Sequence, residues 1–184
     1  MSNASSAELP KIVDPYKLAE HNSVLEGSIP LRALPRFRDA VLGFDDDAAC
    51  RVKLSFYMDS QRRRIVSGEL EAPVNLECQR CMGPMGVVLV SQFILGLVTS
   101  DEQAQGLPRD LEPFLTDDFS ADLWSMVEDE LLLVLAPYPL HERGDCPASE
   151  ELEAYEPDGS SAEPEEKTGD NPFSVLAGLK NTKH

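Results

Sequence analysis

The chain has 184 residues, 42% of them hydrophobic, which is enough for one globular domain whose core needs no disulfides. Sixteen lysine and arginine residues stand against 33 aspartate and glutamate residues, so the formal net charge is −17. This charge excludes a protein that coats DNA, RNA or an anionic membrane with its whole surface, and leaves open a local basic patch or a basic protein partner.

Segment 1–10 is rich in serine and alanine and is predicted to be disordered. It lacks the apolar stretch of a secretion signal, and no apolar run reaches the ~20 residues that span a bilayer. We therefore expect a cytoplasmic protein without a membrane partner. In a reducing compartment its four cysteines are expected to be thiols or metal ligands rather than disulfides.

Residues 11–146 are predicted to form an α+β domain built on strands. Segment 49–59 alternates apolar and polar residues with period two, and segments 64–77 and 87–99 continue in a β pattern. Three such segments in succession predict an antiparallel sheet or a partly open barrel. Pro73 in the second segment predicts an edge position or a bulge, because proline has no N–H to donate to a ladder.

Two helices are predicted beside these strands. Asp14 followed by Pro15 marks the start of a short one, since aspartate caps helices and proline suits the first helical position. Segment 120–136 predicts one long helix, which Pro137 ends. Its apolar residues at helical spacing are Leu123, Met126, Val127, Leu131, Val134 and Leu135.

The carboxy-terminal part of the sequence is acidic and then apolar again. Segment 147–170 is crowded with Glu, Pro, Ser and Gly and is predicted to be a disordered linker. Segment 171–180 predicts a short helix whose one face carries Phe173, Leu176 and Leu179. This helix either docks on a partner or folds back onto its own domain, and the sequence leaves both alternatives open.

The sharpest chemical signal is Cys78-x-x-Cys81, placed between two β-patterned segments and followed by glycine and proline. Two thiolates at this spacing bind one Zn²⁺ when the backbone forms a tight turn, whereas a redox pair of this type begins a helix. His141 and Cys146, just after the long helix, complete a candidate Cys₃His zinc set. The alternative is that the cysteines are simple thiols and His141 is a surface residue.

A second candidate site is basic. Arg62, Arg63 and Arg64 are consecutive at a predicted turn, Arg51 and Lys53 share the polar face of one strand, and Arg80 lies between the two cysteines. Such a cluster suits contact with RNA phosphates. The alternative is an ordinary solvated face.

No constellation for catalysis is recognisable. The sequence has no G-x-S-x-G, no H-E-x-x-H and no phosphate-binding glycine loop, and its acidic clusters lack positioning partners. The residues therefore predict a protein that is not an enzyme.

Five motifs in combination resemble the YceD family, the bacterial large ribosomal RNA subunit accumulation proteins. They are Leu76-Glu-Cys-Gln-Arg-Cys81, Ser100-Asp-Glu-Gln-Ala, Met126-Val-Glu-Asp-Glu-Leu131, His141…Cys146 and Asn171-Pro-Phe-Ser-Val-Leu-Ala-Gly-Leu-Lys180. The resemblance runs from about residue 11 to residue 180. It implies a role in the synthesis, processing or stability of 23S rRNA, and it implies no enzymatic activity.

Together, the residues and the resemblance predict a ribosome-biogenesis factor that acts as an adaptor or chaperone. Its expected partner is a ribosomal protein of the large subunit or an assembly factor, because an acidic protein shields basic charge and speeds encounter with it. The alternatives are direct binding of 23S rRNA through the basic residues, or a zinc-stabilised accessory to an RNA-processing enzyme.

Overall fold

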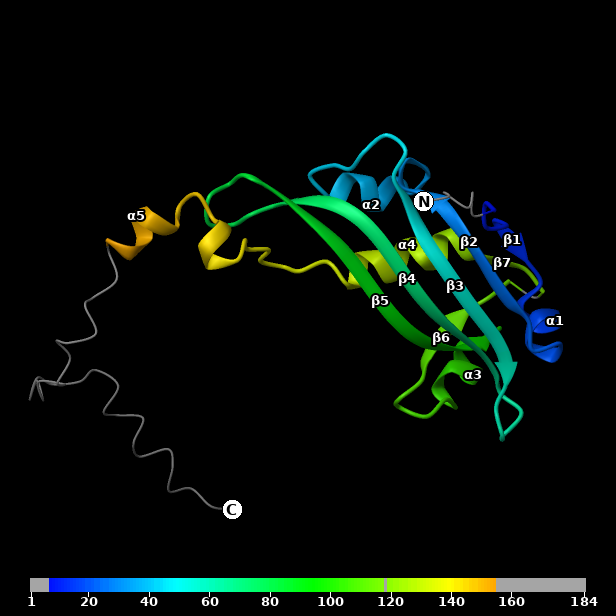
Figure 1. Cartoon of the computed structure of the whole chain (residues 1–184). Helices are drawn as coiled ribbons and strands as arrows, with labels where there is room; N and C mark the ends of the chain where they lie inside the picture. The colour runs from blue at the N-terminus through cyan, green and yellow to red at the C-terminus, as the bar shows by residue number, and fades with distance from the viewer. Residues whose placement is uncertain (1–6, 118, 155–184) are drawn as a thin grey trace, which may run out of the picture. The chain divides into compact units, whose positions relative to one another are not determined.

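The computed structural model describes residues 7–117 and 119–154 (Figure 1). Residues up to Pro147 form one compact unit, and the residues that follow form a second one. The strands are β1 (Ile12–Val13), β2 (Val24–Pro30), β3 (Ala49–Met58), β4 (Arg64–Glu77), β5 (Pro84–Val98), β6 (Glu112–Leu115) and β7 (Ala121–Asp122). The helices are α1 (Pro15–Glu20), α2 (Pro35–Ala40), α3 (Asp101–Gln105), α4 (Leu123–Leu133) and α5 (Ser149–Glu153), with short 3₁₀ turns η1 (Leu31–Ala33) and η2 (Arg143–Asp145).

Five strands form one open sheet in the order β2-β3-β4-β5-β6. All neighbours are antiparallel except β5 and β6, which pair in parallel over four residues. The predicted α+β class with an antiparallel sheet is confirmed, and the sheet does not close into a barrel. β1 and β7 form a separate two-stranded pairing at the start of α4.

Alternation of side chains along β3, β4 and β5 gives the sheet one buried and one outer face. Cys50, Val52, Leu54 and Phe56 of β3 point into the core, while the residues between them face outward. Helix α4 lies across the buried face, behind the strands in the view of Figure 1. Its residues Leu123, Met126, Val127 and Leu131 join the same core.

Pro73 lies in β4, a central strand, yet its predicted edge character holds locally. The ladder with β3 ends at the pair Arg51↔Glu71, so β4 continues past its neighbour. Two residues on, the N–H of Asn75 points to this side and donates to the carbonyl of Gly43. At position 73 a backbone N–H would point to the same side, where the ladder with β3 has already ended. The N–H that proline lacks is therefore not needed for a strand pairing there.

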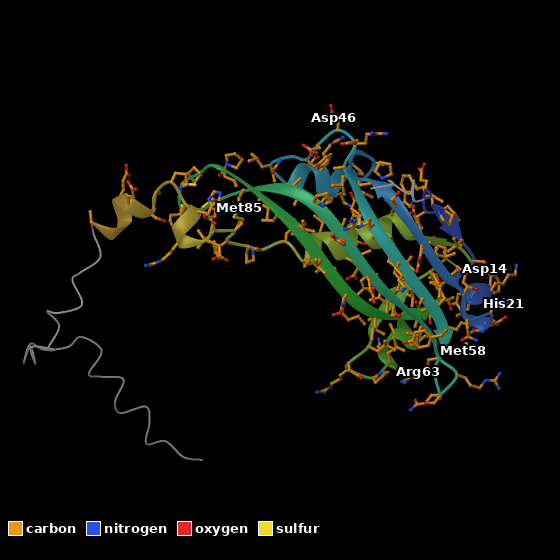
Figure 2. The ribbon with its side chains drawn as sticks, in the orientation of Figure 1. Asp14, His21, Asp46, Met58, Arg63 and Met85 are labelled. Carbon is orange, nitrogen blue, oxygen red and sulfur yellow. The ribbon has the colours of Figure 1, made fainter. Side chains whose placement is uncertain are left out.

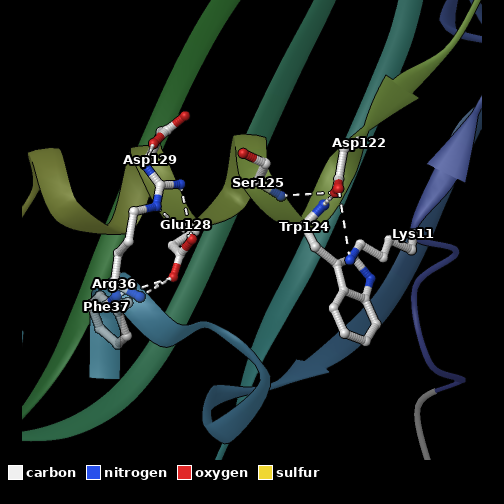
Figure 3. A network of polar contacts seen from close by, with 8 residues as sticks. All are labelled: Lys11, Arg36, Phe37, Asp122, Trp124, Ser125, Glu128 and Asp129. Carbon is white, nitrogen blue, oxygen red and sulfur yellow. Dashed lines mark hydrogen bonds and ion pairs between the residues drawn. The ribbon is translucent and has the colours of Figure 1, made fainter. Parts of the chain in front are cut away.

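A buried carboxylate joins α2 to α4. No side chain next to α2 in sequence caps this helix. Instead Glu128 of α4, only 5% exposed, accepts hydrogen bonds from the backbone N–H groups of Arg36 (2.7 Å) and Phe37 (3.1 Å). Arg36 also donates its Nε to Glu128 at 2.9 Å and contacts Asp129 at 2.6 Å (Figure 3). Glu128 thus supplies from a distant element the cap that the local sequence lacks.

The prediction that residues 1–10 are disordered is wrong for residues 7–10. Leu9 is buried, and its N–H donates to the carbonyl of Ser28 in β2. The Trp124 indole N–H donates to the Leu9 carbonyl at 2.9 Å. A Cβ at Gly27 would meet the Ala7 carbonyl at 2.7 Å, so glycine is what lets this segment lie against β2. Residues 1–6 lie outside the described part of the chain.

The long helix is shorter than predicted at both ends. Residues 121–122 pair with β1 as β7 instead of starting the helix, and the Asp122 side chain caps α4 by accepting from the N–H groups of Trp124 and Ser125 (Figure 3). Helix α4 ends at Leu133, four residues before Pro137. The later start follows from the pairing with β1, which the 3.6-residue periodicity does not encode.

The predicted linker 147–170 is described only as far as residue 154. Within that part the structure contains α5, so these residues are helical where the composition predicts disorder. The rest of the linker and the predicted helix 171–180, with its apolar residues Phe173, Leu176 and Leu179, lie outside the described residues.

The α2–α4 junction predicts a specific loss of stability. We expect Glu128→Ala to lower the free energy of unfolding by about 2–3 kcal/mol, because it leaves the N–H groups of Arg36 and Phe37 without an acceptor. Asp129→Ala is the matched control, since Asp129 contacts the same arginine from the exposed side and should cost less than about 1 kcal/mol. Urea unfolding followed by circular dichroism measures both, and equal losses would contradict the capping role.

Candidate metal centre

The β4–β5 turn carries the first half of the cluster. Cys78 and Cys81 lie at its tip, where the N–H of Met82 donates to the Cys78 carbonyl at 2.8 Å and the N–H of Cys78 donates to the Gly83 carbonyl at 2.9 Å. Met82 has a φ of 57°, in the left-handed region. This tight turn points both sulfurs to the same side, as a two-cysteine metal knuckle requires.

The chain after α4 supplies the second half. It returns to the turn, and the N–H of Gln79 donates to the carbonyl of Pro139 at 2.9 Å. His141 and Cys146 follow, and the candidate ligand atoms of Cys78, Cys81, His141 and Cys146 all lie within 4.8 Å of one another. The structure therefore brings together all four residues of the predicted zinc set.

The His141 ring is oriented by two contacts. Its Nδ1 lies 3.4 Å from the Cys81 sulfur, and its Nε2 lies 3.2 Å from the carbonyl oxygen of Pro84. A proton on Nε2 donates to that carbonyl and leaves Nδ1 with a lone pair directed at the sulfurs. Metal-bound histidines show this arrangement, in which the second nitrogen donates to a backbone carbonyl.

Negative charge at the centre is concentrated on Cys78. Burial opposes ionisation of this thiol, but backbone N–H groups of Cys81, His141 and Arg80 donate to its sulfur, and its pKa falls to about 5. The Gly83 N–H favours a Cys81 thiolate, yet burial and the sulfurs of Cys78 and Cys146 outweigh it and raise the pKa of Cys81. Hydrogen bonding to Cys78 raises the pKa of His141. Without a cation, a thiolate on Cys78 therefore disfavours a second one on Cys81.

The donor set and its spacing suit Zn²⁺. Three sulfurs and one imidazole nitrogen are a recognised set for a structural zinc ion, and Cys78 and Cys146 are buried, as closed sites are. A regular tetrahedron with ~2.3 Å bonds separates its ligand atoms by about 3.8 Å. Ligand atoms already within 4.8 Å need only small side-chain movements to reach it.

The fourth cysteine, Cys50, does not belong to the cluster. It is fully buried on the core face of β3, and burial raises the pKa of its thiol to about 12. This agrees with the alternation of its strand, which places Cys50 with the apolar residues.

The predicted basic residues are not brought into one patch. Arg62, Arg63 and Arg64 lie at the β3–β4 turn and Arg80 at the β4–β5 turn, at opposite ends of β4. Figure 2 shows this separation in the positions of Arg63 and of Met85, which follows the second turn. A strand as long as β4, which has 14 residues, spans roughly 45 Å.

Most of these side chains already have acidic or aromatic partners. Arg51 forms an ion pair with Glu71, and Lys53 lies 3.5 Å from Glu26, in both cases across neighbouring strands. Arg63 contacts Asp59 at 2.6 Å within its turn. These pairs reduce the positive charge that the surface can offer to a phosphate.

Arg64 and Arg80 lie partly buried. Arg64 contacts Glu20 at 3.3 Å and packs on the Tyr16 ring at 4.6 Å. Nη1 of Arg80 is buried and has no hydrogen-bond partner among the described residues. Arg62 is exposed at its turn. Arg62 thus differs from the exposed residues Arg51 and Lys53, because no ion pair of the described residues involves it.

The sequence reasoning did not identify Pro84, whose carbonyl oxygen orients His141. A backbone acceptor has no side-chain signature, so only the folded turn reveals it.

Among the residues that the structure describes, no helix is long and apolar enough to cross a membrane.

Comparison with known proteins places these observations in a family. Residues 66–180 match the family model described as "Large ribosomal RNA subunit accumulation protein YceD". The chain is 35% identical over 176 residues to the curated protein of that name from Haemophilus influenzae, an alignment that covers 94% of this chain and 97% of that protein. No solved structure matches. The match spans more than half of the chain and nearly all of its relative, and this chain therefore belongs to the YceD family.

Proposed function

We propose that this protein supports the accumulation of large-subunit ribosomal RNA in the cytoplasm, as a non-catalytic adaptor in large-subunit assembly. The observation that carries the proposal is the family membership, since the family and its Haemophilus influenzae member are named for large ribosomal RNA subunit accumulation. That name refers to a process and to no reaction.

The charge of the chain favours contact with a basic protein over contact with RNA. A net charge of −17 repels phosphates, and ion pairs reduce the positive charge that Arg51, Lys53 and Arg63 can offer to RNA. The same acidic charge attracts a ribosomal protein of the large subunit or a basic assembly factor. Phe173, Leu176 and Leu179 remain a second proposed contact with such a partner.

We also propose that Cys78, Cys81, His141 and Cys146 bind one structural Zn²⁺. The ion would compensate the clustered sulfurs, because coordination removes their thiol protons and offsets the repulsion between thiolates. It would also cross-link the β4–β5 turn to the segment that follows α4. All four ligands would come from the protein, which is the closed arrangement of a structural rather than a catalytic zinc ion.

The zinc proposal makes a stoichiometric prediction. We expect the purified protein to bind about one Zn²⁺ per chain, and Cys146→Ser to weaken binding at least about 100-fold, since it removes a direct ligand. Cys50→Ala is the matched control, because Cys50 lies in the core and should keep the full zinc content. Elemental analysis and competition with a chromophoric chelator measure both. Equal zinc loss in the two variants would contradict the assigned ligand set.

The proposed function predicts a cellular result. In a bacterium that lacks its own YceD protein, we expect this chain to restore the ratio of 23S rRNA to small-subunit rRNA. The Cys78→Ser, Cys146→Ser double variant should restore it less well, because the ion no longer holds the two segments together. Unchanged rRNA levels with the folded wild-type chain would refute the function, whereas full activity of the double variant would refute only the role of the zinc.

The apolar residues near the carboxy terminus predict a separate result. Replacing Phe173, Leu176 and Leu179 together by alanine should lower 23S rRNA accumulation without changing the urea midpoint of the domain. Replacing the hydroxyl-bearing Ser174 by alanine is the control and should have no effect. A large fall in the urea midpoint of the triple variant would show that these residues are part of the core instead.

A further inference from the structure

Strand β5 has an open edge along most of its length. It pairs with β4 from Pro84 to Gly96, but its other neighbour, β6, covers only Leu95–Val98. Between residues 84 and 94, no described strand lies on this side of β5. Such an edge is a template for a further strand, and proteins that leave one exposed use it or protect it.

The direction of the backbone groups along this edge follows from the ladder. Val98 directs its carbonyl away from β4, where it accepts from the N–H of Thr116. Because the groups of successive residues alternate between the two sides of a strand, the residues at even positions also point away from β4. These are Gly86, Val88, Val90, Gln92 and Ile94. The side chains of Val88, Val90 and Ile94 are more than half exposed on the outer face of the same edge.

An acidic groove adjoins the edge. A cavity of about 700 Å³ lies over residues 92–95 of β5 and extends to Asp110, Glu112, Glu130 and Leu133. Glu69 and Lys53 of the neighbouring strands also line it, so carboxylates outnumber the one lysine. The groove therefore favours a cationic occupant.

Glu130 differs from the other carboxylates of the groove because its side chain is largely buried. Its side chain is only 9% exposed, it lines the cavity, and no described side chain or backbone group donates a hydrogen bond to it. Burial, together with the charges of Glu112 and Asp129, raises its pKa. Burial removes part of the water around this carboxylate, and a cation placed in the groove would offset the cost of its charge.

We propose that the open edge of β5 and the groove beside it bind an extended, basic polypeptide segment, which adds to the sheet as a sixth strand. Its backbone bonds the outward N–H and C=O groups of β5, and its alternate side chains lie beside Val88, Val90 and Ile94. One lysine or arginine enters the groove and meets Glu130 and Glu112. The inference rests on the proposed adaptor function and specifies the chemistry by which the adaptor holds a basic partner.

Three other occupants fit this site less well. RNA phosphates would face the carboxylates of Asp110, Glu112 and Glu130 at close range. The chain's own segment 147–170 carries nine acidic residues and one lysine, so it meets the same repulsion. A second copy of the protein would bring its own acidic groove to the shared strand pair. A basic segment of another protein is the occupant with complementary charge.

The test uses the full-length protein and a fluorescent peptide of ten alternating lysine and valine residues. We expect it to bind, and a glutamate–valine peptide not to bind. Val90→Pro should weaken binding at least about tenfold, because it removes an outward N–H and blocks the edge while leaving the β4 ladder intact. Val90→Ala is the matched control and keeps that N–H. Glu112→Gln together with Glu130→Gln should also weaken binding about tenfold and reduce its salt dependence.

Hydrogen exchange of the unmodified protein keeps the test decisive if Val90→Pro does not fold. The amides of Val88, Val90, Gln92 and Ile94 should gain protection when the lysine–valine peptide binds, and the outward amides of β2 should not. Protection elsewhere, binding that survives Val90→Pro, preferential binding of an RNA oligomer, or self-association through the edge would each overturn the proposal. If the peptide does not bind but the chain restores 23S rRNA, the docking site is refuted and the proposed function is retained. If the chain does not restore the rRNA, the proposed function is refuted, whether or not the peptide binds.

Discussion

The long β4–β5 hairpin is the constraint on which the rest of the structure depends. Its ladder runs from Ile65↔Gly96 to Glu77↔Pro84, well past the last pair that β4 makes with β3. The turn projects beyond β3, and there the segment that follows α4 reaches Cys78 and Cys81. On the other side of the hairpin, β5 keeps a long unpaired edge, because β6 pairs only with its last four residues. The length of the hairpin beyond both neighbouring strands thus underlies the cysteine-rich centre and the open edge.

The position of α4 links the core to the centre. Its buried side chains fix the helix against the sheet, and Glu128 ties it to the N-terminus of α2 through two backbone N–H groups. The chain leaves α4 in a defined direction, and the Gln79–Pro139 hydrogen bond fastens it to the hairpin turn. Binding of Zn²⁺ at the proposed centre would cross-link the hairpin turn and the segment after α4, which the backbone hydrogen bond already joins.

Several of the basic side chains of this protein are paired with carboxylates. Cross-strand contacts neutralise Arg51 and Lys53, and Asp59 and Glu20 contact Arg63 and Arg64. The excess of carboxylates therefore dominates the field around the molecule. A family member named for rRNA accumulation need not contact RNA itself, and the proposed adaptor role would use this acidic surface and the open strand edge to shield a basic partner chain.

The sequence by itself determined the features that depend on neighbours a few residues away. Period-two alternation gave strands β3 and β4 within one residue of their ends, Asp14 and Pro15 marked the start of α1, and glycine and proline after Cys81 placed the two cysteines at a turn. Tertiary structure decided what depends on distant packing. It brought His141 and Cys146 to that turn and ordered residues 7–10 against β2. It also gave α2 its cap from Glu128 and placed the predicted basic residues at separate sites, several of them in ion pairs. Local patterns record only which face of an element is apolar, whereas the choice of distant partners follows from how those faces pack together in the core.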